Sequence, residues 1–163
     1  MDVAYREFAN KPERYAYINE QLIRILAETD DLYAGLANAS ALFMLLMPKL
    51  NWAGFYLMKD GALKLGPFQG KPAVARIEVG AGVCGTAVQR DAPQIVEDVH
   101  SCCNHIASDM ASSSEIVVPI RANGRIFGVI DIDSPALANF DSEDLAGLQI
   151  AAEKIGAFAE AAI

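Results

Sequence analysis

Apolar residues recur with a helical period in three stretches of the chain. In residues 13–28 they fall at i, i+4, i+7 and i+8, as Ile18, Leu22, Ile25 and Leu26. Residues 31–47 repeat the pattern until Pro48, which ends it because proline has no backbone N–H to donate within a helix. The third stretch begins at Asp141 or Ser142, and both are residue types that cap helices. The sequence therefore predicts two helices near the start of the chain and one at its end.

From residue 52 onward the apolar period shortens to two, which is typical of strands. Two pairs of runs predict hairpins: residues 52–58 with 62–68, and residues 115–121 with 125–133. Two shorter strands and a short helix are predicted between them, at residues 75–79, 94–97 and 85–90. Residues 98–113 show no period and predict a long loop, a feature that is often functional. Helices around an antiparallel meander predict an α+β domain, with a central antiparallel sheet flanked by N- and C-terminal helices.

Carboxylates gather towards the end of the last predicted strand. Alternation places four side chains on one face of it: Phe127, Val129, Asp131 and Asp133. Asp131 and Asp133 then lie about 7 Å apart. The place of Glu115 depends on the hairpin turn, because a two-residue turn pairs it with Ile132, on the opposite face. A three-residue loop with Gly124 in the left-handed conformation pairs it with Asp131 instead, so that all three acids share a face.

Composition narrows the classes of partner. A chain of 163 residues with 53% hydrophobic content fits one domain with a core of its own. The formal net charge of −8 and the scattered basic residues argue against a nucleic-acid partner, which needs clustered Lys and Arg. The longest apolar run, residues 41–47, is too short to span a bilayer, and the first residues lack the apolar core of a secretory signal. We therefore expect a cytoplasmic protein without a membrane partner.

Seven motifs stand in an order and spacing that resemble one family. They read NWAGFYL (51–57), LGPFQGKPA (65–73), GAGVCGTAV (80–88), PQIVEDVH (93–100), HIASD (105–109), SSSEIVVPI (112–120) and GVIDIDSP (128–135). Across residues 14–155 the chain resembles the free methionine-(R)-sulfoxide reductases, a family of single GAF domains. The resemblance implies one GAF domain over residues 1–163, with its core at roughly 14–160.

What the resemblance implies about function is specific. It implies an oxidoreductase that binds free L-methionine-(R)-sulfoxide and reduces it to methionine by thiol chemistry. No cofactor is expected, and a dithiol such as thioredoxin is the expected reductant. Members of the family are commonly homodimers, and a homodimer is expected here. A GAF domain that binds cyclic nucleotides is disfavoured, because an acidic pocket repels phosphate.

The resemblance assigns substrate binding to five residues: Trp52, Tyr56, Glu115, Asp131 and Asp133. Trp52 and Tyr56 are four positions apart on a predicted strand, so they share a face, and an aromatic wall suits a methyl–sulfur group. The acids would hold the ammonium group of a free amino acid, which requires the three-residue hairpin loop. The local pattern alone favours other interpretations, because aromatic residues on strands are usually core residues and acids are common at strand ends.

The cysteines depart from the family pattern. Reduction of a sulfoxide needs a thiolate that attacks sulfur while an acid protonates the departing oxygen, and a second thiol that resolves the resulting sulfenic acid. The resemblance places the attacking cysteine at Ser108, one resolving cysteine at Val74 and another at Cys84. Serine cannot replace the attacking thiol, since its alkoxide is hardly available near neutral pH and oxygen forms no sulfenic acid.

Three hypotheses account for Ser108. In the first, Cys102 or Cys103, from the same loop, supplies the catalytic thiol together with Cys84. In the second, the chain is a catalytically silent GAF module that binds or senses a small amino-acid-like ligand. In the third, serine was introduced to trap a ligand or to prevent oxidation, although Val74 and the adjacent cysteines do not look introduced. Thiol consumption on addition of the sulfoxide separates the first hypothesis from the second.

The thiols and histidines also have other interpretations. Cys84 stands at the predicted start of a short helix, whose dipole would lower the pKa of the thiol. Alternatively, Cys84 is a small buried apolar side chain.

Cys102 and Cys103 lie between His100 and His105, a mixture that zinc binds. The spacing fits zinc poorly, because adjacent cysteines rarely both reach one metal ion, so no metal is expected there.

Overall fold

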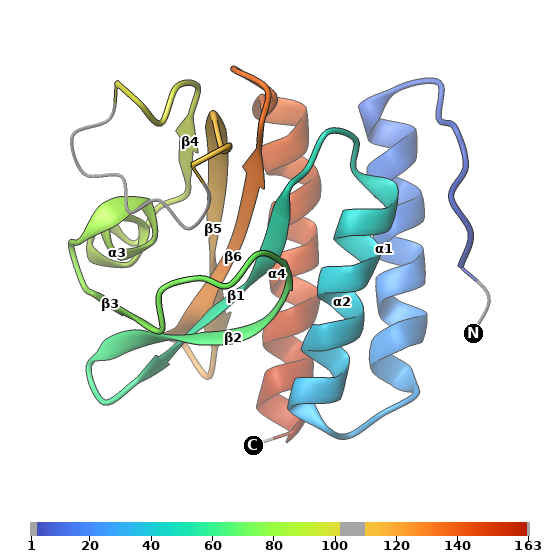
Figure 1. Ribbon diagram of the computed structural model, residues 1–163. Helices are drawn as coiled ribbons and strands as arrows, with labels where there is room; N and C mark the ends of the chain where they lie inside the picture. The colour runs from blue at the N-terminus through green and yellow to red at the C-terminus, as the bar shows by residue number, and fades with distance from the viewer. Residues whose placement is uncertain (1–2, 102–109, 163) are drawn as a thin grey trace.

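The computed structural model describes residues 3–101 and 110–162, within which the chain forms four helices and six strands (Figure 1). The helices are α1 (Lys11–Ala27), α2 (Leu32–Leu46), α3 (Gly82–Arg90) and α4 (Ser142–Ala162). The strands are β1 (Trp52–Lys59), β2 (Ala62–Gly70), β3 (Arg76–Glu78), β4 (Gln94–Val96), β5 (Ser114–Ala122) and β6 (Arg125–Ser134). Every predicted helix and strand is present with small differences at its ends, the largest being α3, which begins at Gly82 and not at residue 85.

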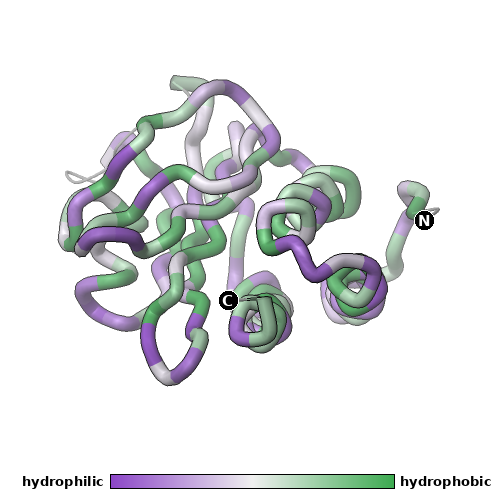
Figure 2. The backbone as a smooth tube through the Cα atoms, turned by 90° about the horizontal axis from the view of Figure 1, so that it is seen from below, coloured by the Kyte–Doolittle hydropathy of each residue, from purple (hydrophilic) through white to green (hydrophobic). Residues whose placement is uncertain are grey.

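The six strands form one antiparallel sheet in the order β3-β2-β1-β6-β5-β4. Helices α1, α2 and α4 lie together on one side of the sheet, and α3 lies on the other (Figure 1). Figure 2 shows the three helices nearly end-on beside the sheet. The predicted α+β architecture, with terminal helices against a central antiparallel sheet, is therefore confirmed. Each helix in the described ranges is too short or too polar to cross a membrane.

Two apolar clusters pack against the two faces of the sheet. The larger one fills the space between the sheet and α1, α2 and α4, and it contains Ile18, Leu22 and Phe43, which are fully buried. Burial of an apolar side chain of this size contributes about 1.5–3 kcal/mol. The smaller cluster lies on the α3 side and contains Trp52 and Tyr56. The helical layer therefore holds the main core, while the α3 side has a smaller core of its own.

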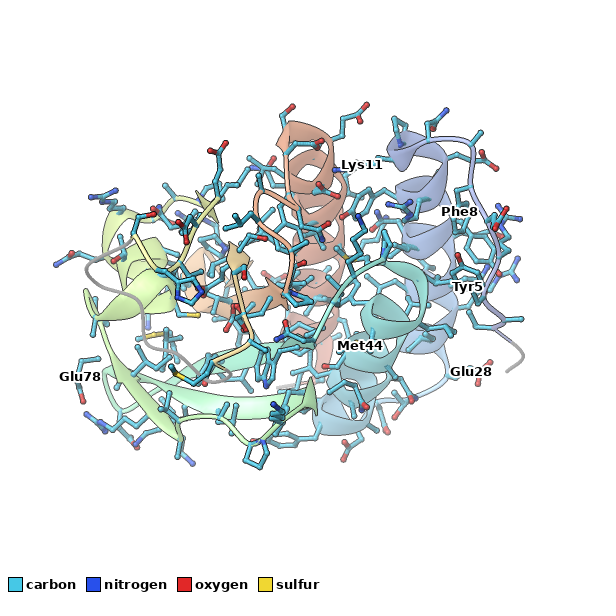
Figure 3. All side chains as sticks on the ribbon, turned by 45° about the horizontal axis from the view of Figure 1, so that its top comes forward. Tyr5, Phe8, Lys11, Glu28, Met44 and Glu78 are labelled. Atoms are coloured by element: carbon cyan, nitrogen blue, oxygen red, sulfur yellow. The ribbon has the colours of Figure 1, made fainter. Side chains whose placement is uncertain are left out.

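The N-terminus of α4 is tied to α1 by a buried carboxylate. Asp141 accepts the backbone N–H of Glu143 at 2.9 Å, so Asp141 is the cap of α4, as one of the two predictions had it. Asp144, a buried residue in the first turn of α4, accepts a hydrogen bond from the hydroxyl of Tyr15 at 2.9 Å. Lys11, labelled in Figure 3, reaches both acids, at 2.8 Å from Asp141. These contacts fix the two terminal helices side by side.

The β5–β6 hairpin turns through two residues. Asn123 and Gly124 have φ values of 51° and 72°, and Ala122 pairs with Arg125 across the turn. Positive φ at both central positions is the geometry of a type I′ turn. The predicted three-residue loop is therefore wrong.

A bulge in β6 follows this turn. Arg121 pairs with Ile126, but Ile120 pairs with Gly128, which leaves Phe127 as an extra residue between the two pairs. The side chain of Phe127 packs with the helix-side cluster. The prediction that Phe127 shares a face with the acids is wrong, because the bulge interrupts the alternation.

The bulge also sets the register of the acids. Glu115 pairs with Asp133. The three-residue loop had predicted that it pairs with Asp131. Residues that pair directly across two antiparallel strands lie on the same face, and Asp131 lies two positions from Asp133. The turn and the bulge together thus place all three carboxylates on the face that α3 covers.

Candidate functional site

Three buried carboxylates and a thiol meet on the sheet face beneath α3. Glu115 comes from β5, and Asp131 and Asp133 come from β6. Cys84 lies in the first turn of α3, and its Sγ and carboxylate oxygens of Glu115 and Asp131 are all within 4.8 Å of one another. These four residues are 3–5% exposed. The predicted acids and one of the predicted thiols are therefore neighbours in a site shielded from solvent.

Burial raises the pKa of Glu115 and of Asp131 well above the usual value of a carboxyl group. For Glu115 the loss of hydration is the largest cause of the raised pKa, and the charge of Asp133 is the second. For Asp131 the loss of hydration is again the largest cause, followed by the charge of Glu115. A hydrogen bond joins the two side chains, which requires a proton on one of them. The pair therefore keeps a proton at a pH where an exposed carboxyl group has lost it.

Cys84 is held in place by the close approach of α3 to β3. A Cβ on Gly85 would lie 2.3 Å from the carbonyl oxygen of Glu78, so this approach needs glycine. Burial raises the pKa of the Cys84 thiol well above its usual value, and the charge of Asp131 adds to the effect. The predicted lowering of this pKa by the helix dipole is wrong, because lost hydration and the neighbouring acids outweigh the dipole.

Trp52 and Tyr56 stack on the same face of β1. Their ring centroids are 6.0 Å apart with planes 22° from parallel, and both residues are 1% exposed. The indole Nε1 of Trp52 donates to the carbonyl oxygen of Lys71 at 3.1 Å, and the Tyr56 hydroxyl donates to that of Val74 at 3.0 Å. Val74, at the position the resemblance gives to a resolving cysteine, packs against the same cluster. The segment after β2 therefore orients both rings.

Phe68 of β2 is a third ring in this wall, and the sequence pattern does not single it out. It stacks on Trp52 with centroids 5.2 Å apart and planes 13° from parallel. A Cβ on Gly54 would lie 2.3 Å from Cβ of Phe68, and one on Gly70 would lie 2.6 Å from Cδ1 of Trp52. Glycine inside a strand often marks a close approach, so Gly54 and Gly70 are the signal that could have found this stack.

The comparisons with known proteins identify the family. The sequence profile of the GAF domain matches residues 20–157. The free methionine-R-sulfoxide reductase of Escherichia coli is 51% identical over 140 residues, which cover 86% of this chain and 85% of that protein. The chain belongs to the free methionine-R-sulfoxide reductase family of GAF domains.

Solved structures of this reductase family share the fold. The free methionine-R-sulfoxide reductase of Neisseria meningitidis, in complex with its substrate, superimposes with a TM-score of 0.94 at 36% identity, over 99% of this chain and 98% of that one. The Staphylococcus aureus enzyme, also in complex with substrate, gives a TM-score of 0.84 at 42% identity, over 88% and 94% of the two chains. The predicted GAF fold and family are both confirmed.

The loop after β4 contains the remaining candidate catalytic residues. Cys102, Cys103 and Ser108 lie outside the described residues, so their predicted roles stay predictions. The stem of the loop is fixed next to the acids, because the N–H of Ser113 donates to the carbonyl oxygen of Ser134 at 2.7 Å. The chain therefore leaves this loop and enters β5 directly beside the carboxylate cluster.

Proposed function

We propose that this protein binds free methionine-(R)-sulfoxide in the site beneath α3 and reduces it to methionine by thiol chemistry. One observation carries the proposal: a stacked aromatic wall, three buried acids and a thiol lie together on one sheet face of a chain from this reductase family. Two relatives in that family are described in complex with their substrate.

The two halves of the site suit the two ends of the ligand. Trp52 and Tyr56 offer a polarisable surface to the methyl–sulfur end, where dispersion and the ring electrons favour a partly positive sulfur. Glu115, Asp131 and Asp133 offer negative charge to the ammonium end. A bound ammonium offsets part of the lost hydration and of the mutual repulsion that raise the pKa of Glu115 and Asp131, while the proton shared by this pair stays available for the reaction.

The reaction needs one attacking thiolate, one proton donor and one resolving thiol. The thiolate attacks the sulfoxide sulfur, the S–O bond breaks, and a protonated carboxyl of the Glu115–Asp131 pair gives its proton to the leaving oxygen. The attack joins the cysteine sulfur to the methionine sulfur, and the oxygen leaves as hydroxide. Hydroxide then attacks the cysteine sulfur, the S–S bond breaks, methionine leaves, and the cysteine is oxidised to a sulfenic acid. The second thiol displaces water from that sulfenic acid to form a disulfide, which an external dithiol reduces.

The raised pKa of Cys84 suits the resolving role. A buried thiol beside carboxylates is protonated near neutral pH, which makes it a poor attacking group until the local charge changes. We assign the attack to Cys102 or Cys103, because Ser108 cannot form the required intermediate. We infer that the protein is cytoplasmic. We propose thioredoxin, which the cytoplasm would supply, as the reductant.

Ser108 also favours a second function, a catalytically silent GAF module that binds the same ligand. Loss of the attacking thiol leaves the aromatic wall and the acids intact. Such a module would bind the sulfoxide through Trp52 and Asp131 and consume no thiols. Both functions share the binding site and differ only in turnover.

Turnover of the two epimers of free methionine sulfoxide, with thioredoxin or dithiothreitol, tests the proposal. The unaltered chain is expected to reduce the R epimer and to lose this activity when Cys102 and Cys103 are both changed to serine. Ser108→Cys is the matched gain-of-function variant. Activity that appears only in Ser108→Cys would establish the silent module, and binding of neither epimer by calorimetry would refute both functions.

We further propose that the protein is a homodimer joined through its terminal helices. Ile23 of α1 and Ile150 of α4 are apolar side chains that are 50% and 47% exposed. Light scattering coupled to size exclusion is expected to give twice the chain mass of 17.5 kDa. A monomer at micromolar concentration would overturn this assembly without affecting the proposed activity.

A further inference from the structure

Three side chains from three different elements present metal-ligating atoms to one point. Cys84 comes from α3, Glu115 from β5 and Asp131 from β6, and their Sγ and carboxylate oxygens lie within 4.8 Å of one another. The zinc site considered from the sequence used other residues, Cys102 and Cys103. The family resemblance placed Cys84, Glu115 and Asp131 in one site, but only the fold shows that their ligand atoms converge on one point.

The spacing of these atoms fits a small tetrahedral cation. With zinc about 2.3 Å from sulfur and about 2.0 Å from oxygen in a tetrahedral arrangement, neighbouring ligand atoms are roughly 3.3–3.5 Å apart. Because the three atoms are at most 4.8 Å apart, a contraction of no more than about 1.5 Å brings them to that spacing. Asp133 pairs with Glu115 across β5 and β6, and its charge acts on both Glu115 and Cys84, so it is the candidate fourth ligand.

An independent observation points to a bound positive group. Asp131 is 5% exposed, and within the described residues its Oδ1 is buried without a hydrogen-bond partner. Burying a carboxylate oxygen without a partner is costly, and a bound cation removes that cost. Oδ1 of Asp131 is therefore available to coordinate a cation, and the Cys84 thiol lies close to the same carboxylate.

We propose that the reduced, substrate-free site binds one thiophilic divalent cation through Cys84, Glu115 and Asp131, and that the cation and the sulfoxide exclude each other. The exclusion rests on the proposed function, since the ammonium of the sulfoxide would use the same carboxylates. A cation in this position inhibits the protein when thiols are reduced and substrate is scarce.

The protons and charges of this binding step balance. The Cys84 thiol and the Glu115–Asp131 pair each release a proton, and the cation takes the thiolate and both carboxylates as ligands. A metal-bound thiolate of Cys84 is not free to displace water from a sulfenic acid. Binding therefore blocks both the ligand site and the resolving thiol.

The donor set selects zinc over the common hard cations. Thiolate is a soft ligand that zinc binds readily, whereas magnesium takes six oxygen ligands and calcium six to eight. Zn²⁺ is therefore the probe for affinity, and Co²⁺ is the probe for ligation. A cobalt–thiolate bond produces a charge-transfer absorption in the near ultraviolet, which oxygen ligands alone do not produce.

The experiment uses the full chain with Cys102→Ser and Cys103→Ser, so that Cys84 is the remaining thiol of the three in the sequence. Calorimetric titration with Zn²⁺, without sulfoxide, is expected to show one site per chain, and Mg²⁺ is expected to show none. Titration with Co²⁺ is expected to produce the charge-transfer band, and this result needs no substitution of Cys84 itself. Free methionine-(R)-sulfoxide is expected to abolish the band.

Three variants test the assignment. Cys84→Ser and Asp131→Asn are each expected to weaken Zn²⁺ binding more than about 100-fold, the upper range for loss of a group behind a metal ligand. Glu97→Gln removes an exposed carboxyl group that follows β4 and is expected to leave the zinc affinity unchanged. Circular dichroism checks that each variant is folded.

The outcomes separate this inference from the proposed function. No Zn²⁺ binding, no charge-transfer band, or zinc affinity unaffected by Cys84→Ser would overturn the cation site, whatever the activity. A cobalt band that persists in saturating sulfoxide would overturn the mutual exclusion. If the metal-free chain binds no sulfoxide while Zn²⁺ binds as described, the proposed function fails and the cation site stands.

Discussion

At the scale of single residues, Glu115 and Asp131 are carboxyl groups whose pKa the fold raises well above the usual value. Each is a carboxyl group that the fold removes from water and places beside other acids, so each has a raised pKa. An acid with a raised pKa in the folded state makes the fold less stable once the pH exceeds the pKa of the unfolded chain. The site is therefore maintained at the expense of stability in the absence of ligand.

The raised pKa values of Glu115 and Asp131 predict how the stability of the protein depends on pH. Above about pH 4, where acids of the unfolded chain ionise, the folded chain holds more protons than the unfolded chain until the raised pKa values are passed. The free energy of unfolding of the ligand-free protein is therefore expected to fall as the pH rises from 5 towards 8. Urea denaturation at several pH values measures this slope, and Asp131→Asn is expected to flatten it.

Asp98→Asn is the matched control for this slope. A hydrogen bond from the Ser101 side chain lowers the pKa of the half-buried Asp98. Its contribution to stability therefore has the opposite sign and is lost as the pH falls through the lowered pKa. Asp98→Asn should therefore leave the slope between pH 5 and 8 unchanged. Equal slopes for the unaltered chain and Asp131→Asn would show that the buried acids do not control stability.

At the scale of elements, the approach of α3 to β3 decides where the Cys84 thiol lies. Gly85 permits that approach, since its Cβ position is 2.3 Å from a backbone oxygen. Gly85→Ala is expected to push α3 outward, lower the free energy of unfolding and weaken binding of both Zn²⁺ and the sulfoxide. Chemical denaturation and calorimetry on the same preparation measure the three quantities.

Gly124→Ala is the control for Gly85→Ala, because it strains the backbone locally without displacing α3. Gly124 has a φ of 72°, and a Cβ there would meet no other atom within 4 Å. Its replacement is expected to cost about 1 kcal/mol of stability through the unfavourable backbone conformation alone. Ligand affinity should stay as it is, and a loss of affinity equal to that in Gly85→Ala would contradict the role given to α3.

At the scale of the whole molecule, the main apolar core and the candidate site lie on opposite faces of the sheet. The larger apolar cluster lies between the sheet and α1, α2 and α4, and the acids, thiol and aromatic wall lie on the opposite face. Central strands β1, β5 and β6 contribute side chains to both faces. The helix-side core therefore supports a rigid sheet on which the site is built.

Leu22→Ala tests this division. Leu22 is fully buried in the helix-side cluster, so its truncation is expected to lower the free energy of unfolding by about 2–5 kcal/mol. The affinity for the sulfoxide should change little at temperatures where the variant stays folded. A drop in affinity comparable to that of Asp131→Asn would mean that the two faces are energetically coupled.

Local information in the sequence determined the elements and the family. Apolar periods of 3.6 and two residues gave the terminal helices and the hairpins, Pro48 ended a helix, and Asp141 capped another. These features depend on neighbours within a few positions, which is why the pattern predicts them. The order of the motifs pointed to the GAF fold and the reductase family, and both were confirmed.

Only the tertiary structure decided the register and the state of the site. The two-residue turn and the bulge at Phe127 together placed Glu115 opposite Asp133, a pairing that neither turn considered from the sequence had predicted. The pKa of Cys84 rose instead of falling, because burial and the charge of Asp131 outweigh a helix dipole that the sequence does reveal. Hydration loss and electrostatic contact depend on groups remote along the chain, so they exist only once the strands and α3 have come together.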